Sequence, residues 1–268
     1  MGLWLCFDNQ PHPYAFSISN KYYCIWKNHL NSIKELGIIN FEVIVKYWPR
    51  LFDGILLTLQ YSAISIPIAI IWGVLIGSIC YRKLPVLSQI AKAYVCFFRE
   101  TPLLVQLYFL FYGASRYIPV SAGMIGVIAL VLNDGAFIAE IIRGGLQSID
   151  VGQREAALSL GFNERQTIIY FLIPQAWKKV LDSIINMMSI IIKDTSMLMW
   201  ITICELTYQC NQVNIYSFDP VSVYVFGAAV YLALFLAVQG IRKLIRFRND
   251  KRNRVAESGT KKEGIILS

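Results

Sequence analysis

Long apolar runs alternate with short polar stretches along most of the chain. Between Gly54 and Tyr81 there is no charged residue in 28 positions, and about 20 apolar residues are enough for a helix to cross the hydrocarbon core of a bilayer. Four further apolar runs follow, so the pattern predicts an all-α membrane protein with about five transmembrane helices. The predicted spans are about 54–81, 88–113, 121–142, 177–206 and 220–241.

Two features within the first two runs predict details of the helices. Gly73 and Gly77 have the GxxxG spacing, which allows another helix to approach closely. The second run contains Thr101-Pro102, and a proline inside a helix removes a backbone hydrogen bond and clashes with the preceding turn. We therefore expect a close contact on the first span and a break or bend in the second.

Composition excludes an ordinary soluble protein. Hydrophobic residues make up 56% of the 268 residues and charged residues only 16%, whereas charged residues make up about 25% of a typical soluble domain. The net charge of +8 is concentrated at the end of the chain, where residues 241–268 hold nine basic and three acidic side chains. Because this basic tail follows an apolar run directly and no nucleic-acid-binding module accompanies it, we expect a cytoplasmic tail and no nucleic-acid partner.

The distribution of basic residues predicts the orientation. Arg82-Lys83, the loop at 143–179 and the tail carry most of the basic residues near span ends, whereas the loops at 114–120 and 207–219 carry only Arg116. Basic residues favour the cytoplasmic side of a membrane. The C-terminus is therefore expected in the cytoplasm and, with five spans, the N-terminus outside.

These observations predict three regions: an extracytoplasmic N-terminal arm at 1–46, a transmembrane domain at 47–245 and a basic cytoplasmic tail at 246–268. The six cysteines include no CxxC motif. They are expected to act as small hydrophobic residues rather than as metal ligands, and we expect no metal site.

A polar passage between the third and fourth spans has the start and end signals of two helices. Asp150 followed by Gln153 fits a helix N-cap with a reciprocal partner, and Gly161 fits the end of that helix near Leu160. Asn163 and Gln166 repeat the capping pattern for a second helix, and Pro174 predicts a turn towards the fourth span. The first helix carries Glu155, Ala156, Ala157 and Leu160, which suits either a docking knob for a partner or a simple surface hairpin.

The spacing of this passage resembles the EAA loop of ABC-importer permeases. Glu155-Ala156-Ala157 is followed after three residues by Gly161 and after nine more by Phe171-Leu172-Ile173-Pro174. The segments GAFIAEIIRGGLQSIDVGQREAALSLGF, FRETPLLVQLYFLFYG and IIIKDTSMLMWITICEL are similar to the polar amino-acid permeases of the histidine, glutamine and arginine type. The resemblance covers about residues 47–248.

The resemblance implies a type I importer permease in the inner membrane of a bacterium. It implies two ATPase subunits, a second copy of this permease or a sister permease, and an extracytoplasmic amino-acid-binding protein as partners. ATP and Mg would be held by the ATPase, because this chain has no G-x-x-x-x-G-K-[ST] motif; no catalytic residue and no directly bound cofactor are expected. The coupling loop would be 144–176, with docking through 150–174. The implied docking residues are Gly152, Glu155, Ala156, Ala157, Gly161 and Pro174.

Charged residues inside the predicted spans suggest a substrate pathway. Asp134 lies near the middle of the third span, and Lys193-Asp194 lie deep in the fourth. In one interpretation Asp134 receives the cationic group of an amino-acid substrate, with Asp194, Thr195 and Ser196 nearby; in the other, Lys193 pairs with an acid and only supports packing. We favour the first for Asp134 and the second for Lys193 and Asp194. The family often has an uncharged residue where this chain has Asp134, which favours a basic substrate.

Two other polar features have simpler interpretations. Gln106 in the second span could line the pathway, but a single glutamine is more often used in a hydrogen bond between helices. Glu140 and Arg143, one turn apart, are expected to form an ion pair.

Two other functional classes fit the sequence less well. An intramembrane aspartyl protease needs two facing aspartates; Asp134 and Asp194 satisfy the number, but the GxGD-type motif is absent. A channel would need no capped cytoplasmic helix. The importer permease is therefore the favoured function.

Overall fold

The structure of the protein is a computed structural model that describes residues 39–82, 85–113, 117 and 120–266, with side chains described as far as residue 244. The chain divides into two compact units, Met1–Phe41 and Glu42–Ser268, and the architecture below is that of the second. Most of the predicted arm, including Cys6 and Cys24, lies outside the described residues. Every regular element in the described part is helical.

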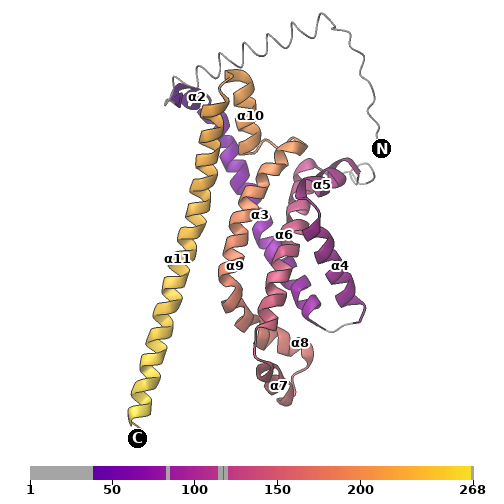
Figure 1. Ribbon diagram of the computed structural model, residues 1–268, viewed down its shortest axis with the longest axis vertical. Coiled ribbons are helices and arrows are strands. Elements are labelled where there is room, and N and C mark those ends of the chain that lie inside the picture. Colours follow the sequence, from indigo (N-terminus) through magenta and orange to yellow (C-terminus); the bar gives the residue numbers. More distant parts are fainter. Residues whose placement is uncertain (1–38, 83–84, 114–116, 118–119, 267–268) are drawn as a thin grey trace, which may run out of the picture. The chain divides into compact units, whose positions relative to one another are not determined.

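The helices follow one another with short connections (Figure 1). In chain order they are α2 (Phe41–Lys46), α3 (Trp48–Tyr81), α4 (Leu87–Glu100), α5 (Leu103–Tyr108), the π-helix η1 (Phe109–Gly113), α6 (Ala122–Gln147), α7 (Val151–Ser159), α8 (Glu164–Gln166), the π-helix η3 (Thr167–Leu172), α9 (Ile173–Asp194), the 3₁₀ helix η4 (Thr195–Ile201), α10 (Leu206–Ser217) and α11 (Pro220–Ile266).

Four helical stretches are long and apolar enough to cross a membrane. They are Trp48–Tyr81, Ala122–Gln147, Glu164–Ile201 and Pro220–Leu244. They correspond to the first, third, fourth and fifth predicted spans. The second predicted span is instead divided into α4 and a short apolar stretch, Leu103–Gly113, so the expected break at Pro102 is confirmed.

Side-chain amides satisfy the backbone at this break. The Gln106 side chain donates to the carbonyl oxygens of Phe98 and Thr101, both at 2.9 Å. The Asn133 side chain of α6 donates to the same Phe98 carbonyl and to the Gln106 amide oxygen, both at 3.1 Å. A broken helix is tolerated at membrane depth when its freed carbonyls find such donors. Gln106 therefore joins two helices, as a single glutamine in a span commonly does.

The contact between α3 and α6 depends on the two glycines of the GxxxG pair. A Cβ atom at Gly73 would lie 2.4 Å from Ile138, and one at Gly77 would lie 2.5 Å from the Ala139 carbonyl oxygen. Only glycine allows the two backbones to come this close, so the predicted close contact is confirmed. α6 also packs against α4, α5 and α9, which makes it the central helix of the unit.

The expected turn at Pro174 is wrong. From Glu164 to Ile201 the chain is helical throughout, and Pro174 lies in the first turn of α9, directly after the π-helix η3. Proline cannot donate the backbone bond that an α-helix requires there. A π-helix is rare and occurs mostly as a single wide turn inside an α-helix; here η3 directly precedes α9, and the chain continues without turning.

Candidate functional site

The first helix of the polar passage is capped at both ends. The Asp150 carboxylate accepts a hydrogen bond from the Gly152 amide at 2.7 Å, and Gly161 after the helix has a φ of 85°, a left-handed conformation that glycine adopts at little cost. The predicted N-cap and C-terminal glycine are confirmed. The predicted reciprocal partner is wrong, because the Gln153 side chain instead accepts a bond from Gln175 at 3.2 Å.

The second helix of the passage begins with a complete capping box. The Asn163 side chain accepts from the Gln166 amide at 2.9 Å, and the Gln166 side chain accepts from the Asn163 amide at 3.0 Å. Two otherwise unsatisfied donors are thereby paired. We call α7, α8 and the turn between them (residues 151–166) the docking element.

The docking element presents some of its expected residues and buries another. Gly152, Glu155 and Ala156 are exposed, whereas Ala157 is only 2% exposed. The expectation that both alanines face a partner is therefore wrong for Ala157, whose methyl group packs inside the chain. Sequence alone could not distinguish the two, because the rotation of α7 depends on its packing against η3.

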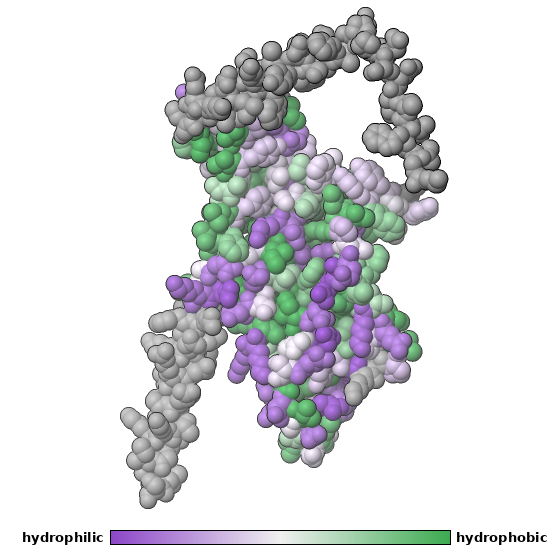
Figure 2. Space-filling model, viewed as in Figure 1, coloured by the Kyte–Doolittle hydropathy of each residue, from purple (hydrophilic) through white to green (hydrophobic). Residues whose placement is uncertain are grey.

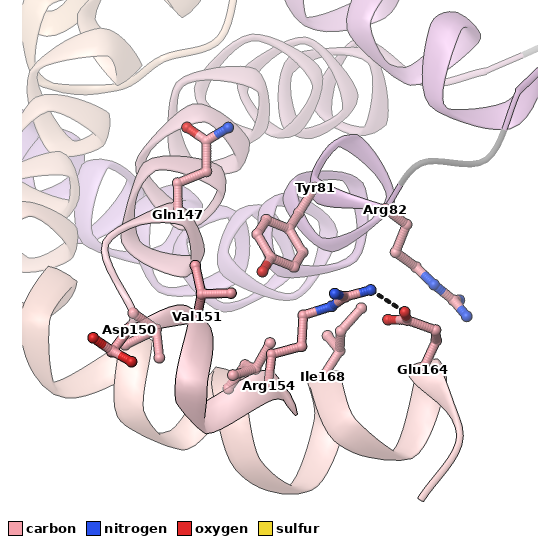
Figure 3. Close-up of a pocket in the computed structure, with 10 residues that line it drawn as sticks. Tyr81, Arg82, Gln147, Asp150, Val151, Arg154, Glu164 and Ile168 are labelled. Atoms are coloured by element: carbon pink, nitrogen blue, oxygen red, sulfur yellow. Dashed lines mark hydrogen bonds and ion pairs between the residues drawn. The ribbon is translucent and has the colours of Figure 1, made fainter. Parts of the chain in front are cut away.

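A cleft of about 510 Å³ lies between the docking element and the C-terminal end of α3 (Figure 3). This end of α3 is the one predicted to face the cytoplasm. Tyr81, the last residue of α3, and Arg82, directly after it, border one side. On the other side Arg154 of α7 forms an ion pair with Glu164 of α8, across the turn at Gly161. Figure 3 shows these two side chains pointing towards each other, while Asp150 points away.

A second cavity, of about 220 Å³, lies within the transmembrane helices. Its walls come from the break before α5, from α6 and from α9. The lining residues are Thr101, Leu103, Asn133, Asp134, Phe137, Met187, Ile190 and Asp194. The structure therefore brings Asp134 and Asp194, which are 60 positions apart in the sequence, to one small space.

Asp134 has an unusual environment. It is 1% exposed, no amide or hydroxyl group of the described residues donates to its carboxylate oxygens, and the Asp194 carboxyl group lies within hydrogen-bonding reach of it. A carboxylate buried without a donor or a counter-ion is strongly unfavourable. Acidic residues inside membrane spans usually face a cavity or a partner for this reason, and this cavity has room for a cationic group.

The other residues expected in the pathway are placed elsewhere. Thr195 is buried and its hydroxyl donates to the Ile192 carbonyl at 2.7 Å, Ser196 is half-buried, and Gln106 is bonded at the helix break. None of these three lines the cavity. Asp194 does line the cavity, together with Asp134, whereas the sequence favoured a role in helix packing for it.

Lys193 differs from its expected role. Its ammonium group lies 4.9 Å from the centre of the Phe235 ring of α11, and no ion pair joins it to an acid among the described side chains. The expected acidic partner is therefore wrong. A cation over an aromatic ring is an alternative way to accommodate a lysine in a span. The predicted pair between Glu140 and Arg143 is confirmed, with Arg143 Nη2 2.5 Å from Glu140 Oε1.

Sequence reasoning missed Glu205, which lies between the last two spanning stretches. It is fully buried, and its carboxylate caps α10 by accepting from the amides of Thr207 and Tyr208 at 2.8 and 2.9 Å. The Tyr231 hydroxyl of α11 also donates to it at 2.9 Å. Burial raises the pKa of the Glu205 carboxyl to about 6, although these hydrogen bonds oppose the rise. A glutamate ahead of a helix start was the available signal.

Polar residues lie on the surface along the spanning helices as well as near the helix ends. Figure 2 shows hydrophilic residues in the middle of the face in view as well as around α7 and α8 at its lower end. On α9, Asn186 and Lys193 are exposed in the single chain. Polar groups exposed along a spanning helix indicate contact with water or with another subunit rather than with lipid.

Comparisons with known proteins agree on one family. Residues 65–251 match the model of the binding-protein-dependent transport system inner membrane component. The chain is 30% identical over 233 residues to the nopaline transport system permease protein NocM of Agrobacterium fabrum, covering 83% of this chain and 97% of that protein. It is 34% identical over 188 residues to the probable glutamine ABC transporter permease protein GlnP of Bacillus subtilis, covering 69% of this chain and 86% of that protein.

Solved structures agree with the sequence comparisons. A chain from the crystal structure of an amino acid ABC transporter with histidines has a TM-score of 0.70 and 31% identity, covering 79% of this chain and 99% of that one. A chain of the inward-facing MetNI methionine ABC transporter, at 19% identity, has the same fold with a TM-score of 0.65, covering 73% of this chain and 94% of that one. The chain therefore belongs to the family of binding-protein-dependent transport system inner membrane components.

Proposed function

We propose that this chain is the membrane-spanning subunit of an ATP-driven amino-acid importer and that a separate ATPase drives it by gripping α7. The observation that carries the proposal is α7 itself, a nine-residue helix capped at both ends, between two spanning helices, with Glu155 and Ala156 exposed. A short rigid helix with one small exposed side chain fits a groove on a partner. Relatives named as amino-acid permeases support the substrate class.

The docking contact would use the exposed surface formed by Gly152, Glu155 and Ala156. Gly161 would set the angle between α7 and α8, and Pro174 would stiffen the first turn of α9. The partner ATPase would hold ATP and Mg, since this chain carries no phosphate-binding loop. The docking element and the C-terminus would lie in the cytoplasm, and the N-terminus outside.

The substrate would be an amino acid with a cationic group, held at Asp134 and Asp194. Two acidic side chains line one small, partly open cavity, and this favours a guanidinium or ammonium group over a neutral side chain. The exposed polar face of α9 would border the pathway, opposite a second permease copy or a sister permease. An extracytoplasmic binding protein would deliver the substrate, and two ATPase subunits would complete the complex.

An aspartyl protease would also need two aspartates at one cavity, so Asp134 and Asp194 do not separate the two functions by themselves. The family match, which covers residues 65–251, favours transport. Purification of the chain with an affinity tag from its native membrane tests the choice directly. A permease should bring down an ATPase and show ATP hydrolysis stimulated by a loaded amino-acid-binding protein. Cleavage of membrane peptides without an associated ATPase would contradict the proposal.

A further inference from the structure

The docking element is fastened to α9. The Gln175 side chain of α9 donates to Gln153 of α7 at 3.2 Å, and Lys179 of α9 donates to the Ser148 carbonyl just before α7 at 2.7 Å. In addition, α8 continues through η3 into α9 without a non-helical residue (Figure 1). A displacement of the docking element therefore has a direct mechanical route into α9.

The same element is separated from α3 by the cleft of about 510 Å³ (Figure 3). Within the described ranges, no hydrogen bond or ion pair joins α7 or α8 to α3. Tyr81 and Arg82 form the opposite wall. Among the described residues, the polar contacts of the docking element and of the residues just before it therefore run to α9 and not to α3.

One polar contact holds the two helices of the docking element together. Arg154 of α7 pairs with Glu164 of α8, and Gly161 lies between them in the sequence at the turn. The two side chains are 37% and 46% exposed, so the pair contributes little to stability. Its effect is on geometry, because it spans the Gly161 turn between α7 and the long helix that begins with α8, and so adds a second polar tie to the Gln153–Gln175 contact.

We propose that Arg154 and Glu164 are positioning residues that make α7 and the α8–η3–α9 helix a single lever. Movement of α7 by the ATPase is then delivered to α9 and displaces Asp194 relative to Asp134. The lever is long, since Asp194 lies about 45 Å from Glu164 at about 1.5 Å of rise per residue. The inference rests on the proposed function, and it adds a cause for the coupling between ATP hydrolysis and transport.

Charge-reversal variants of Arg154 and Glu164 test the lever. They are measured in a complex reconstituted from this chain, the ATPase and the binding protein. The single variants Arg154→Glu and Glu164→Arg should still bind the ATPase, but the amino acid transported per ATP hydrolysed should fall about fivefold or more. The double variant R154E/E164R restores the pair with reversed charges and should regain most of the lost coupling. Lys92→Glu, a charge reversal at an exposed position of α4 outside the docking element, is the matched control and should leave the ratio unchanged.

The outcomes separate the lever from the proposed function. If the wild-type complex couples ATP hydrolysis to uptake but the single variants equal the wild type, or the double variant is no better than the singles, the lever is wrong. If the wild-type chain binds no ATPase, the proposed function itself fails. Thermal unfolding of each variant in detergent shows whether a loss reflects folding; Glu164→Gln, which removes only the charge, should lower coupling without lowering the melting temperature.

Discussion

Asp134 combines near-complete burial with two carboxylate oxygens that accept no hydrogen bond from an amide or hydroxyl group of the described residues. A group in this state is stabilised by a cationic ligand more than by the apolar walls around it. We expect Asp134→Asn to weaken binding of a basic amino acid by at least about tenfold, or about 1.4 kcal/mol. Equilibrium binding of labelled arginine, lysine and histidine to the purified complex measures this.

The matched control for Asp134 is Asp53→Asn, the same substitution at an exposed position of α3. It should leave binding unchanged. Unaltered affinity and unaltered preference among amino acids in Asp134→Asn would remove this residue from the substrate site.

Ala156 and Ala157 are adjacent but have opposite environments. Ala156→Arg places a large charged side chain on the exposed face of α7, so we expect normal insertion and normal melting temperature but loss of the ATPase during purification. Ala157→Arg forces a charge into a buried position, so we expect a low melting temperature or no folded protein. A folded Ala156→Arg variant that retains the ATPase would contradict the docking surface.

The buried carboxyl of Glu205 should make the folding stability of the protein depend on pH. Burial raises the pKa of its carboxyl from 4.5 to about 6, so the folded protein binds this proton more tightly than the unfolded chain. The associated stabilisation, about 2 kcal/mol, is present below pH 4.5 and is lost as the pH rises through 6. The difference in melting temperature between the wild type and Glu205→Gln should therefore change between these pH values.

The exposed Glu155→Gln variant is the control for Glu205. Its melting temperature should follow that of the wild type at every pH. A constant difference between wild type and Glu205→Gln across the range would show that this carboxyl does not titrate as its buried position requires.

Features that depend on neighbouring residues in the sequence were predictable, whereas contacts between residues on different helices were not. The caps at Asp150 and Asn163 follow from side chains that bond to nearby backbone groups, so a few neighbouring residues were enough to predict them. The meeting of Asp134 with Asp194 depends on the packing of α6 against α9. The position of Lys193 over Phe235 depends likewise on α11, and no local pattern contains this information.

At the scale of elements, the contact between α3 and α6 shows what a spacing pattern in the sequence can predict and what it cannot. Gly73 and Gly77 predicted a close helix, but the partner helix was identified only by the structure. We expect Gly77→Ala to cost about 1–3 kcal/mol, because its Cβ would meet the Ala139 carbonyl oxygen of a neighbouring backbone at 2.5 Å. Thermal unfolding of the purified protein measures the loss.

Gly144 of α6 provides the control for the glycine contact. A Cβ atom there meets nothing within 4 Å, and alanine favours a helix over glycine by up to about 1 kcal/mol. Gly144→Ala should therefore leave the melting temperature unchanged or raise it slightly. Equal effects at Gly77 and Gly144 would mean that the close approach of α3 and α6 does not limit stability.

The second span shows an element that sequence predicted in part. Pro102 marked the break correctly because proline acts on its own backbone. The repair of the break required Asn133 from another helix together with Gln106, which periodicity does not reveal. The π-helix before Pro174 was missed because the sequence indicates an irregularity there without specifying its form.

At the scale of the whole molecule, apolar runs were sufficient to predict a helical membrane protein, since bilayer thickness sets the length of each span. In the proposed function, the direction of transport and the motion of the spans would depend on subunits outside this chain. Two parts of the protein are linked in the proposed function: α7, where an ATPase would bind, and the cavity at Asp134 and Asp194, where a cation would be held. The helix from Glu164 to Ile201 begins after the turn that follows α7 and reaches the cavity at Asp194.

Uptake into proteoliposomes is the most direct test of ATP-driven transport through this chain. Vesicles containing the chain and its ATPase, with the binding protein outside and ATP inside, should accumulate a labelled basic amino acid, and Ala156→Arg should abolish the ATP-dependent part. Accumulation of a basic amino acid that requires neither ATP nor an unaltered α7 surface would contradict the claim that a separate ATPase drives this chain through α7.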